Sequence, residues 1–368
     1  MRALSFLVRY ASLALLFGLC LEVMARIDDW VTYRAPFWGR YDESVLRDLD
    51  ADGIPRNVPG ARFEKWNVNS LGFRGPEAPR EKPPGIQRVV CLGQSESFGL
   101  YEGEGDEWPA ALGRMLRRRH PDVEVLNASV VGTGRRTRKA YLDKYVLPLD
   151  PDVVVLYFNV LNEAAAALDD PGPDRDPQAA PARRVRSAAD ALPQLRVLKK
   201  MKVALQGALP ASFNSRVQAW LWGRKLRALE EELPRPPVDA IPDEDVAGFE
   251  GHVRDVVALL RSRGIRPVLA TYPTLVAPEN ASRYWSYLSA QRLFMVQLSE
   301  RGLMDAARRL NEVTRRVSRD LDVPLVDVDA IVPKDADHFA DLVHYTSRGA
   351  ELVAASTSHV LETSHVLR

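Results

Sequence analysis

Three side chains, one early and two late in the chain, have the types and spacing needed for nucleophilic catalysis. Ser95 follows Gly93-Gln94 directly after a short apolar run, and Asp341 lies three residues before His344. A serine hydroxyl attacks an ester when a base removes its proton and a carboxylate holds that base in the right tautomer. The spacing of three predicts that Asp341 and His344 share one face of a helical turn. These residues predict a serine hydrolase; a serine that only caps a helix is the alternative.

A second pair with the same spacing lies slightly earlier in the chain. Asp335 precedes His338 by three residues, with Asp337 between them. The stretch 345–349, which follows His344, has the composition of a helix start, whereas nothing similar directly follows His338. We therefore predict that His344 is the base and that His338 is not.

Short apolar runs alternate with amphipathic helical patterns from residue 87 onward. We predict strands over 88–92, 123–126, 152–158, 266–271 and 324–328, and helices over 107–119, 253–263 and 304–321. Continuously apolar strands separated by such helices are typical of a parallel sheet covered on both faces. The predicted fold is therefore a three-layer α/β/α fold with a central parallel sheet. Ser95 would lie at the carboxyl edge of that sheet, where such folds bind ligands.

Residues 165–245 interrupt this alternation and are predicted to be a helical insertion. They begin with a loop rich in aspartate and proline over 169–177 and continue into a basic helical stretch from Arg183 to Leu205. The first interpretation is a solvated helical cap over the active-site edge. The second is a surface that contacts acidic lipid or an anionic polymer. Its basic residues are Arg183, Arg184, Arg186, Arg196, Lys199, Lys200 and Lys202.

The N-terminus carries the localisation signal. An apolar run between Leu4 and Ala25, with Arg2 and Arg9 near its start, is long enough to cross a bilayer at about 1.5 Å per residue. We predict a transmembrane signal anchor over 1–26, a membrane-proximal spacer over 27–86 that packs on the domain, and a catalytic domain over 87–368. The arginines would stay in the cytoplasm and the domain would be periplasmic, on the inner membrane. A cleaved signal peptide, giving a secreted protein, and a buried helix of a soluble protein are the alternatives.

Composition and charge exclude several classes of protein. With 368 residues and 46% hydrophobic content the chain can bury a large core. Its formal charge of +1 argues against a dedicated nucleic-acid-binding protein. The six histidines are scattered and none pairs with another at metal-ligand spacing, so no metal and no cofactor is predicted. Cys20 and Cys91 fall in an apolar run and a buried strand, which argues against a disulfide.

The ordered motifs resemble those of the SGNH (GDSL-type) hydrolase superfamily over residues 67–358. Residues 93–99 resemble the block Gly-Asp-Ser-x-(Ser/Thr)-x-Gly, residues 127–132 the second block, and residues 160–163 the block Gly-x-Asn-Asp. Asp341 and His344 match the last block. The segment 69–74 resembles one that precedes the domain in membrane-anchored members.

This resemblance implies a flavodoxin-like fold and assigns a role to each residue. Ser95 would be the nucleophile, His344 the base and Asp341 the orienting acid. The oxyanion hole would consist of the backbone N–H groups of Ser95 and Gly132 and the side-chain amide of Asn162. Asn159 is the alternative candidate for the side-chain amide that is assigned to Asn162.

Three positions depart from the family pattern. Gln94 replaces an aspartate, Val160 a glycine and Glu163 an aspartate. None of these changes removes a proposed catalytic atom, because the nucleophile, base, acid and oxyanion donors are kept. Gln94 still forms hydrogen bonds but carries no charge.

The resemblance implies a membrane-anchored envelope esterase that hydrolyses a carbohydrate or lipid ester through a Ser-His-Asp triad. Its partners would be a small-molecule, polysaccharide or lipid ester and the membrane, with no nucleic acid. Two other functions fit the same motifs. One is an O-acetyltransferase that acts on a cell-surface polysaccharide. The other is a catalytically inactive glycan-binding or assembly module, in which Gln94 and Glu163 mark a decayed site.

Overall fold

The structure is a computed structural model that describes residues 2–39, 41–131, 133–168, 195–208, 222–233 and 235–367. The chain forms two compact units. The larger comprises Leu46–Arg62, Trp66–Arg175 and Trp222–Arg368, and the smaller comprises Met1–Val45, Phe63–Lys65 and Asp176–Leu221.

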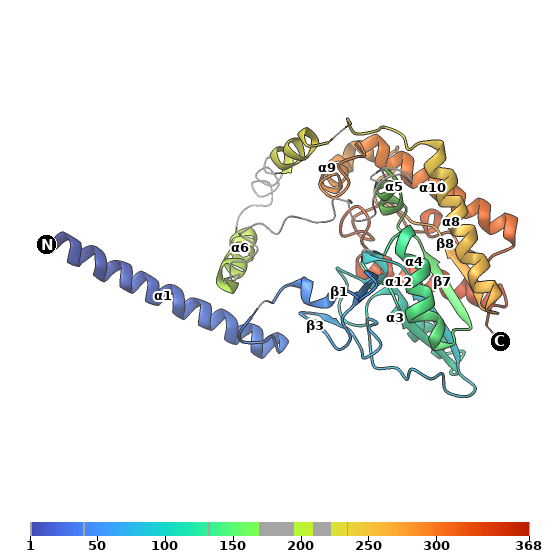
Figure 1. The fold of residues 1–368 in the computed structure, drawn as a ribbon, viewed down its shortest axis with the longest axis horizontal. Helices are drawn as coiled ribbons and strands as arrows, with labels where there is room; N and C mark the ends of the chain where they lie inside the picture. The colour runs from blue at the N-terminus through green and yellow to red at the C-terminus, as the bar shows by residue number, and fades with distance from the viewer. Residues whose placement is uncertain are drawn as a thin grey trace. The chain divides into compact units, whose positions relative to one another are not determined.

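A five-stranded parallel sheet forms the centre of the larger unit (Figure 1). Its strands are β5 (Gln87–Leu92), β6 (Val123–Asn127), β7 (Val153–Tyr157), β8 (Arg266–Ala270) and β9 (Leu325–Val326), in the order β6-β5-β7-β8-β9. All residues of β5 and β7 are buried, because helices cover both faces of the sheet. The predicted parallel sheet is confirmed. Only β9 is much shorter than predicted, since the chain turns into the short helix α11 (Val328–Ile331).

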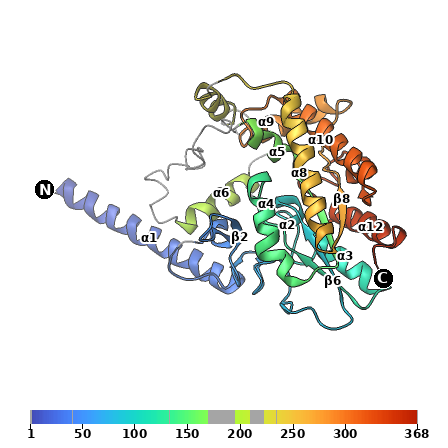
Figure 2. The ribbon, with the colours of Figure 1, turned by 45° about the vertical axis from the view of Figure 1, so that its right-hand side comes forward.

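Helices form the two outer layers. On one face α3 (Trp108–Arg117) packs against α12 (Ser347–Thr363). On the other, α5 (Val160–Leu168), α8 (Asp243–Ser262) and α10 (Glu300–Leu321) contact one another, and α4 (Arg135–Tyr141) contacts α8 (Figure 2). This arrangement confirms the predicted three-layer α/β/α fold.

Two helices begin earlier than their apolar periodicity predicts. The first turn of α8 carries acidic residues at 243–245, which the positive end of the helix dipole favours. Helix α10 begins after Ser299, whose hydroxyl accepts a hydrogen bond from Gly302 N at 3.0 Å. Polar start signals thus extend both helices beyond their apolar stripes.

Several further elements, most of them of two to five residues, connect or precede these. They are η1 (Glu43–Leu46), β1 (Arg47–Leu49), β2 (Pro55–Asn57), β3 (Arg62–Phe63), β4 (Trp66–Asn67), α2 (Ser95–Phe98), η2 (Leu142–Val146), η3 (Leu147–Leu149) and α9 (Ala281–Gln291). Strands β1 and β2 pair antiparallel.

The segment before the sheet contributes to the larger unit through buried polar contacts. Asn57 Nδ2 donates to the carbonyls of Gly72 and Ser129, each at 3.1 Å. Arg74 N donates to Asn127 O at 3.2 Å. Gly72 has a φ of +82°, a conformation that favours glycine. These contacts attach Asn57 and Arg74 to the end of β6 and the loop that follows it.

The smaller unit contains α1 (Arg2–Tyr33) and α6 (Arg196–Ala208). Within α1, Arg9–Tyr33 is long and apolar enough to cross a membrane, with a mean hydropathy of 1.7. A signal sequence meets the same criteria, so this is a candidate span. Most of these side chains are exposed, unlike those of a core helix. Of the predicted basic stretch, only the part from Arg196 is described; Arg183, Arg184, Arg186 and the loop 169–177 lie outside the described residues.

Candidate active site

Ser95 lies at the carboxyl end of the central strand β5. The strand ends at Leu92, Gly93 and Gln94 form the exit, and α2 begins at Ser95 itself. The exit requires glycine, because a Cβ at Gly93 would lie 2.2 Å from Ser97 Oγ. Ser95 keeps 9% of its surface exposed in this tight turn.

The loop after β6 holds this serine loop from the side. Ser129 Oγ accepts a hydrogen bond from Gly93 N at 3.1 Å, and Val130 N donates to Gly93 O at 3.2 Å. Asn127 Nδ2 donates to Ser97 O at 2.9 Å. Gly132, the predicted oxyanion donor, lies outside the described residues.

Asp341 and His344 form a hydrogen-bonded pair. His344 Nδ1 lies 2.7 Å from Asp341 Oδ2. The other carboxylate oxygen, Oδ1, accepts hydrogen bonds from Val343 N at 2.9 Å and from His344 N at 2.8 Å. The segment 341–343 is a bend and not the predicted helical turn. The spacing of three works because the aspartate closes the bend onto its own backbone.

The surroundings of this pair tune both groups. Burial lowers the pKa of His344, but the hydrogen bond and charge of Asp341 and the charges of Glu96 and Glu102 outweigh it, so the pKa is raised. Burial raises the pKa of Asp341, but the hydrogen bond and charge of His344 outweigh it, so the pKa is lowered. The ring of Tyr101 lies against the ring of His344, with 5.3 Å between their centroids. The Tyr101 hydroxyl is hydrogen-bonded to the Asp341 carboxylate. The Asp341 carboxylate therefore favours the imidazolium form of His344.

His344 Nε2 is buried and has no hydrogen-bond partner among the described residues. This nitrogen is the atom that would accept a proton from a nucleophile. His338 and Asp335 form an equal pair, also at 2.7 Å. The charge of His344 lowers the pKa of Glu96, so His344 lies near that carboxyl group. The Asp341–His344 pair is therefore beside the serine loop.

Glu96 is a site residue that the sequence analysis missed. Ser95 Oγ donates to Glu96 Oε2 at 3.2 Å, and Asn159 Nδ2 donates to the same oxygen at 3.3 Å. Glu96 Oε1 accepts from Gln94 N at 3.2 Å. Only 1% of Glu96 is exposed, and this burial raises its pKa; the surrounding donors and the charge of His344 oppose the effect only in part. Three donors thus converge on one buried carboxyl group beside the serine.

The two asparagines of the third block both reach the serine loop. Asn162 Nδ2 donates to Gln94 Oε1, and Gln94 Nε2 donates to Thr133 O at 2.6 Å. Asn162 N donates to Asn159 Oδ1 at 3.0 Å. Gln94, which departs from the family pattern, therefore links the third block to the loop that follows the second.

Glu163, which stands where the family pattern has an aspartate, forms a buried ion pair. Its carboxylate lies 2.9 Å from the guanidinium of Arg138, and both side chains are almost fully buried. Arg138 also lies 3.2 Å from His252 Nε2 and 4.5 Å from the ring centre of Phe158. Burial and the charge of Arg138 lower the pKa of His252 to about 3. The neutral histidine and the ion pair join α4, α5 and α8.

The family follows from the sequence match to these elements. The family model of GDSL-like lipases and acylhydrolases matches residues 91–352, from inside β5 to inside α12. The chain belongs to the GDSL-like lipase/acylhydrolase family. This GDSL-like protein is a hydrolase that acts on ester bonds.

Solved structures similar to this GDSL-like chain include three bacterial or metagenomic enzymes. A lipase/acylhydrolase from Enterococcus faecalis is 17% identical, with a TM-score of 0.43, covering 76% of this chain and 97% of that one. Axe2, an acetylxylan esterase from Geobacillus stearothermophilus, is 13% identical, with a TM-score of 0.42, covering 75% of this chain and 94% of that one. LAE5, an α/β hydrolase from a lake metagenome, is 16% identical, with a TM-score of 0.41, covering 77% of this chain and 96% of that one. Among curated proteins, none shows significant similarity. The family assignment rests on the sequence match alone.

Arg74 is a further residue whose contacts the sequence did not reveal. Its guanidinium donates to the carbonyls of Phe98 and Gly99 and, at 2.9 Å, to that of Gly103. It also lies 3.4 Å from the buried carboxylate of Glu107. The loop after α2 in this GDSL-like domain is therefore held by a residue from the preceding segment.

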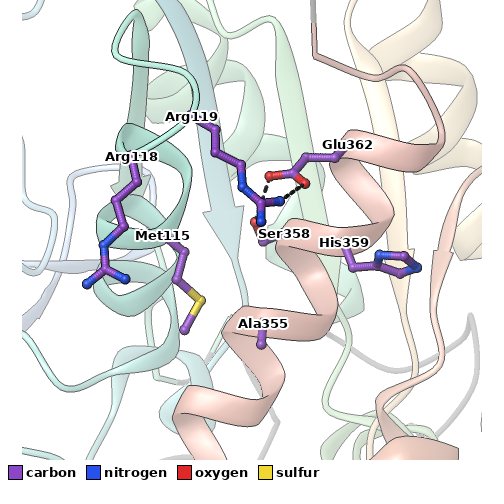
Figure 3. A pocket seen from close by; sticks show the side chains of 7 residues that line it. All are labelled: Met115, Arg118, Arg119, Ala355, Ser358, His359 and Glu362. Carbon is purple, nitrogen blue, oxygen red and sulfur yellow. Dashed lines mark hydrogen bonds and ion pairs between the residues drawn. The ribbon is translucent and has the colours of Figure 1, made fainter.

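Two hollows of the GDSL-like domain contain none of the candidate catalytic residues. One, of about 270 Å³, lies between α3 and α12, where Arg119 pairs with Glu362 at 2.8 Å (Figure 3). The other, of about 490 Å³, lies beside the loops after β8 and β9 and is lined by polar residues such as Asn311 and Asp329 and by apolar ones such as Val276 and Met304. Leu275, in the first of those loops, donates its N–H to Leu342 O at 2.8 Å. The second hollow is thus close to the segment that carries His344.

Replacing Glu163 by glutamine should lower the free energy of unfolding by about 3 kcal/mol, because it leaves Arg138 buried without its counter-charge. Urea denaturation followed by circular dichroism measures this change. Glu312→Gln is the control, since Glu312 pairs with the exposed Arg319 and its loss should cost under about 1 kcal/mol. Equal losses of unfolding free energy in the two variants would show that the buried Glu163–Arg138 pair stabilises the fold no more than an exposed pair does.

Proposed function

We propose that this chain is a serine esterase in which Ser95 is the nucleophile, His344 the base and Asp341 the acid that orients the base. The observation that carries the proposal is the Asp341–His344 pair, at 2.7 Å, with a buried Nε2 that has no partner among the described residues. Ser95 Oγ attacks the ester carbonyl while His344 takes its proton. His344 then returns the proton to the leaving alcohol, and water releases the acyl group.

The oxyanion of this reaction would be stabilised by the backbone N–H groups of Ser95 and Gly132 and by the amide of Asn162. The link from Asn162 through Gln94 to Thr133 supports this assignment, because it fixes the amide beside the serine loop. Asn159 is engaged by Glu96 instead. Loss of one such donor costs about 100- to 1000-fold in turnover.

Glu96 defines the resting state in this proposal. The Ser95 hydroxyl donates to Glu96 before substrate binds, and it turns to His344 Nε2 when the reaction starts. The charge of Glu96 also favours the imidazolium form of His344. The reaction needs the neutral imidazole, so activity should rise with pH through the raised pKa of His344.

Glu96→Gln should therefore move the acid limb of the kcat/KM profile to lower pH, by a few tenths to about one pH unit. The glutamine keeps the shape but removes the negative charge that raises the pKa of His344. Glu104→Gln is the control, because Glu104 is exposed in the loop after α2 and should leave the limb in place. An acid limb that stays unchanged in Glu96→Gln would contradict this role.

We infer that the substrate is a short-chain ester of an envelope carbohydrate or lipid. The hollow beside the His344 segment has both polar and apolar lining residues, which suits an ester with a polar alcohol part, and the candidate span in α1 supports a location at the membrane. The domain would be periplasmic and anchored in the inner membrane, or secreted if the segment is cleaved.

Hydrolysis assays with the purified full chain test this function. We expect release of acetate from an aryl acetate and from acetylated sugars, with little activity on long-chain aryl esters. No turnover of any ester by folded protein would contradict the proposal. Transfer of the acetyl group to an added glycan in place of water would favour the O-acetyltransferase.

A further inference from the structure

One face of the C-terminal third of α1 is polar and buried. Glu22, Ala25, Arg26 and Asp29 repeat at helical spacing, and the three charged residues are each exposed by less than a tenth. These charges lie inside the apolar candidate span, where unpaired charges are costly. Glu22 and Arg26 pair with each other at 2.8 Å, which leaves the buried Asp29 to be compensated from outside α1.

Helix α6 supplies that compensation. Lys200 Nζ lies 2.6 Å from Asp28 Oδ2 and 2.7 Å from Asp29 Oδ1, and Arg196 lies 3.6 Å from Asp29. Val197 N donates to Glu22 Oε2 at 3.0 Å. The first two turns of α6 thus cover the polar face of α1 and are ion-paired to it.

The opposite faces of both helices are apolar and exposed. Leu195, directly before α6, and Leu198 and Met201 on α6 follow one another at a spacing of three, with exposed fractions of 46%, 58% and 57%. This stripe lies opposite Arg196 and Lys200 on the helix. On α1 the exposed apolar residues of the same region are Val23, Met24, Ile27, Trp30 and Val31.

We propose that α6 is a membrane-bound helix, which lies against α1 at the bilayer interface with Leu198 and Met201 in contact with lipid. The inference rests on the anchoring by α1 proposed above and is independent of the esterase chemistry. A lipid surface fits better than a protein partner, because the apolar residues of α1 at this level belong to the candidate span. Trp30 and the exposed Trp38 follow at its end, where aromatic side chains favour the interface. An apolar stripe on a helix with a cationic face is typical of interfacial helices.

Fluorescent probes on single cysteines test this placement in the full chain, reconstituted in vesicles of neutral and anionic phospholipid. In a Cys20→Ser background the remaining Cys91 is buried, so a label attaches only at the introduced position. The positions are Leu198→Cys on the apolar stripe and Lys199→Cys as the matched control, since Lys199 pairs with Glu64. Met201→Cys repeats the test on the same stripe, and Leu15→Cys reports the span itself.

We expect spin-labelled lipid to quench the probes at positions 15, 198 and 201, and aqueous iodide to quench the probe at 199 more strongly than these three. Quenching of the probe at 198 by iodide as strong as that at 199 would overturn the proposal, as would protection of 198 from both quenchers, which indicates a protein cover. Quenching by lipid at 15 but not at 198 rejects the role of α6 and keeps the anchor. If spin-labelled lipid does not quench the probe at position 15, the membrane anchor is rejected and the proposal for α6 with it. None of these results depends on ester hydrolysis.

Discussion

Replacement of Ser95 by alanine should lower kcat/KM for an aryl acetate by at least about 10⁴-fold. The variant loses the atom that forms the acyl-enzyme, while Asp341 and His344 keep their hydrogen bond. Steady-state hydrolysis by equal amounts of folded parent and variant protein measures the effect.

Ser97→Ala is the matched control for this variant. Ser97 lies on the same short helix, is fully buried, and its hydroxyl has no hydrogen-bond partner among the described residues. We expect its activity to stay within a few-fold of the parent. If Ser95→Ala were as active as Ser97→Ala, the nucleophile would have to be another residue.

The second large effect is expected for Asp341→Asn, which should reduce kcat/KM by about 10³- to 10⁴-fold. The asparagine amide would donate to Nδ1 of His344, so that the proton moves to Nε2 and this nitrogen no longer accepts one. Burial would then act on the histidine without its carboxylate, which lowers the pKa of His344. The residual activity should therefore have its acid limb at lower pH than the parent.

Asp335→Asn provides the control, because Asp335 and His338 form a pair of the same spacing and the same length. It should leave kcat/KM unchanged within about two-fold, since neither residue is proposed to touch the reacting atoms. Equal losses in Asp335→Asn and Asp341→Asn would mean that both changes act through folding and not through the tautomer of His344.

The sheet could be predicted from sequence because each strand is a continuous apolar run that is buried on both faces. The strands β5, β6, β7 and β8 lie within one residue of their predicted bounds at each end. Strand β9 could not be bounded in this way, since Val328 is apolar and buried whether it ends a strand or starts a helix. The start of α8 was also missed, because its first turns are polar and the apolar stripe begins later.

The sequence predicted the contact between Asp341 and His344 but not the polar residues that surround the candidate site. Asp341 and His344 are close in the chain, so their spacing alone predicts contact. Glu96 and Glu163 are acidic residues that the sequence could not distinguish from solvated ones, because Asn159 and Arg138 reach them from distant segments. Arg74 is a similar case, since its acceptors lie some 25 residues later in the chain. Buried polar contacts of this kind depend on tertiary structure.

The most direct test of the central claim is labelling of the folded full chain with a fluorophosphonate probe, followed by mass spectrometry of the modified peptide. The account predicts one modified residue, Ser95, with labelling much slower in His344→Ala and unchanged in His338→Ala. Modification of a different serine, or no modification of protein that is demonstrably folded, would contradict the proposal that Ser95 is a nucleophile activated by His344.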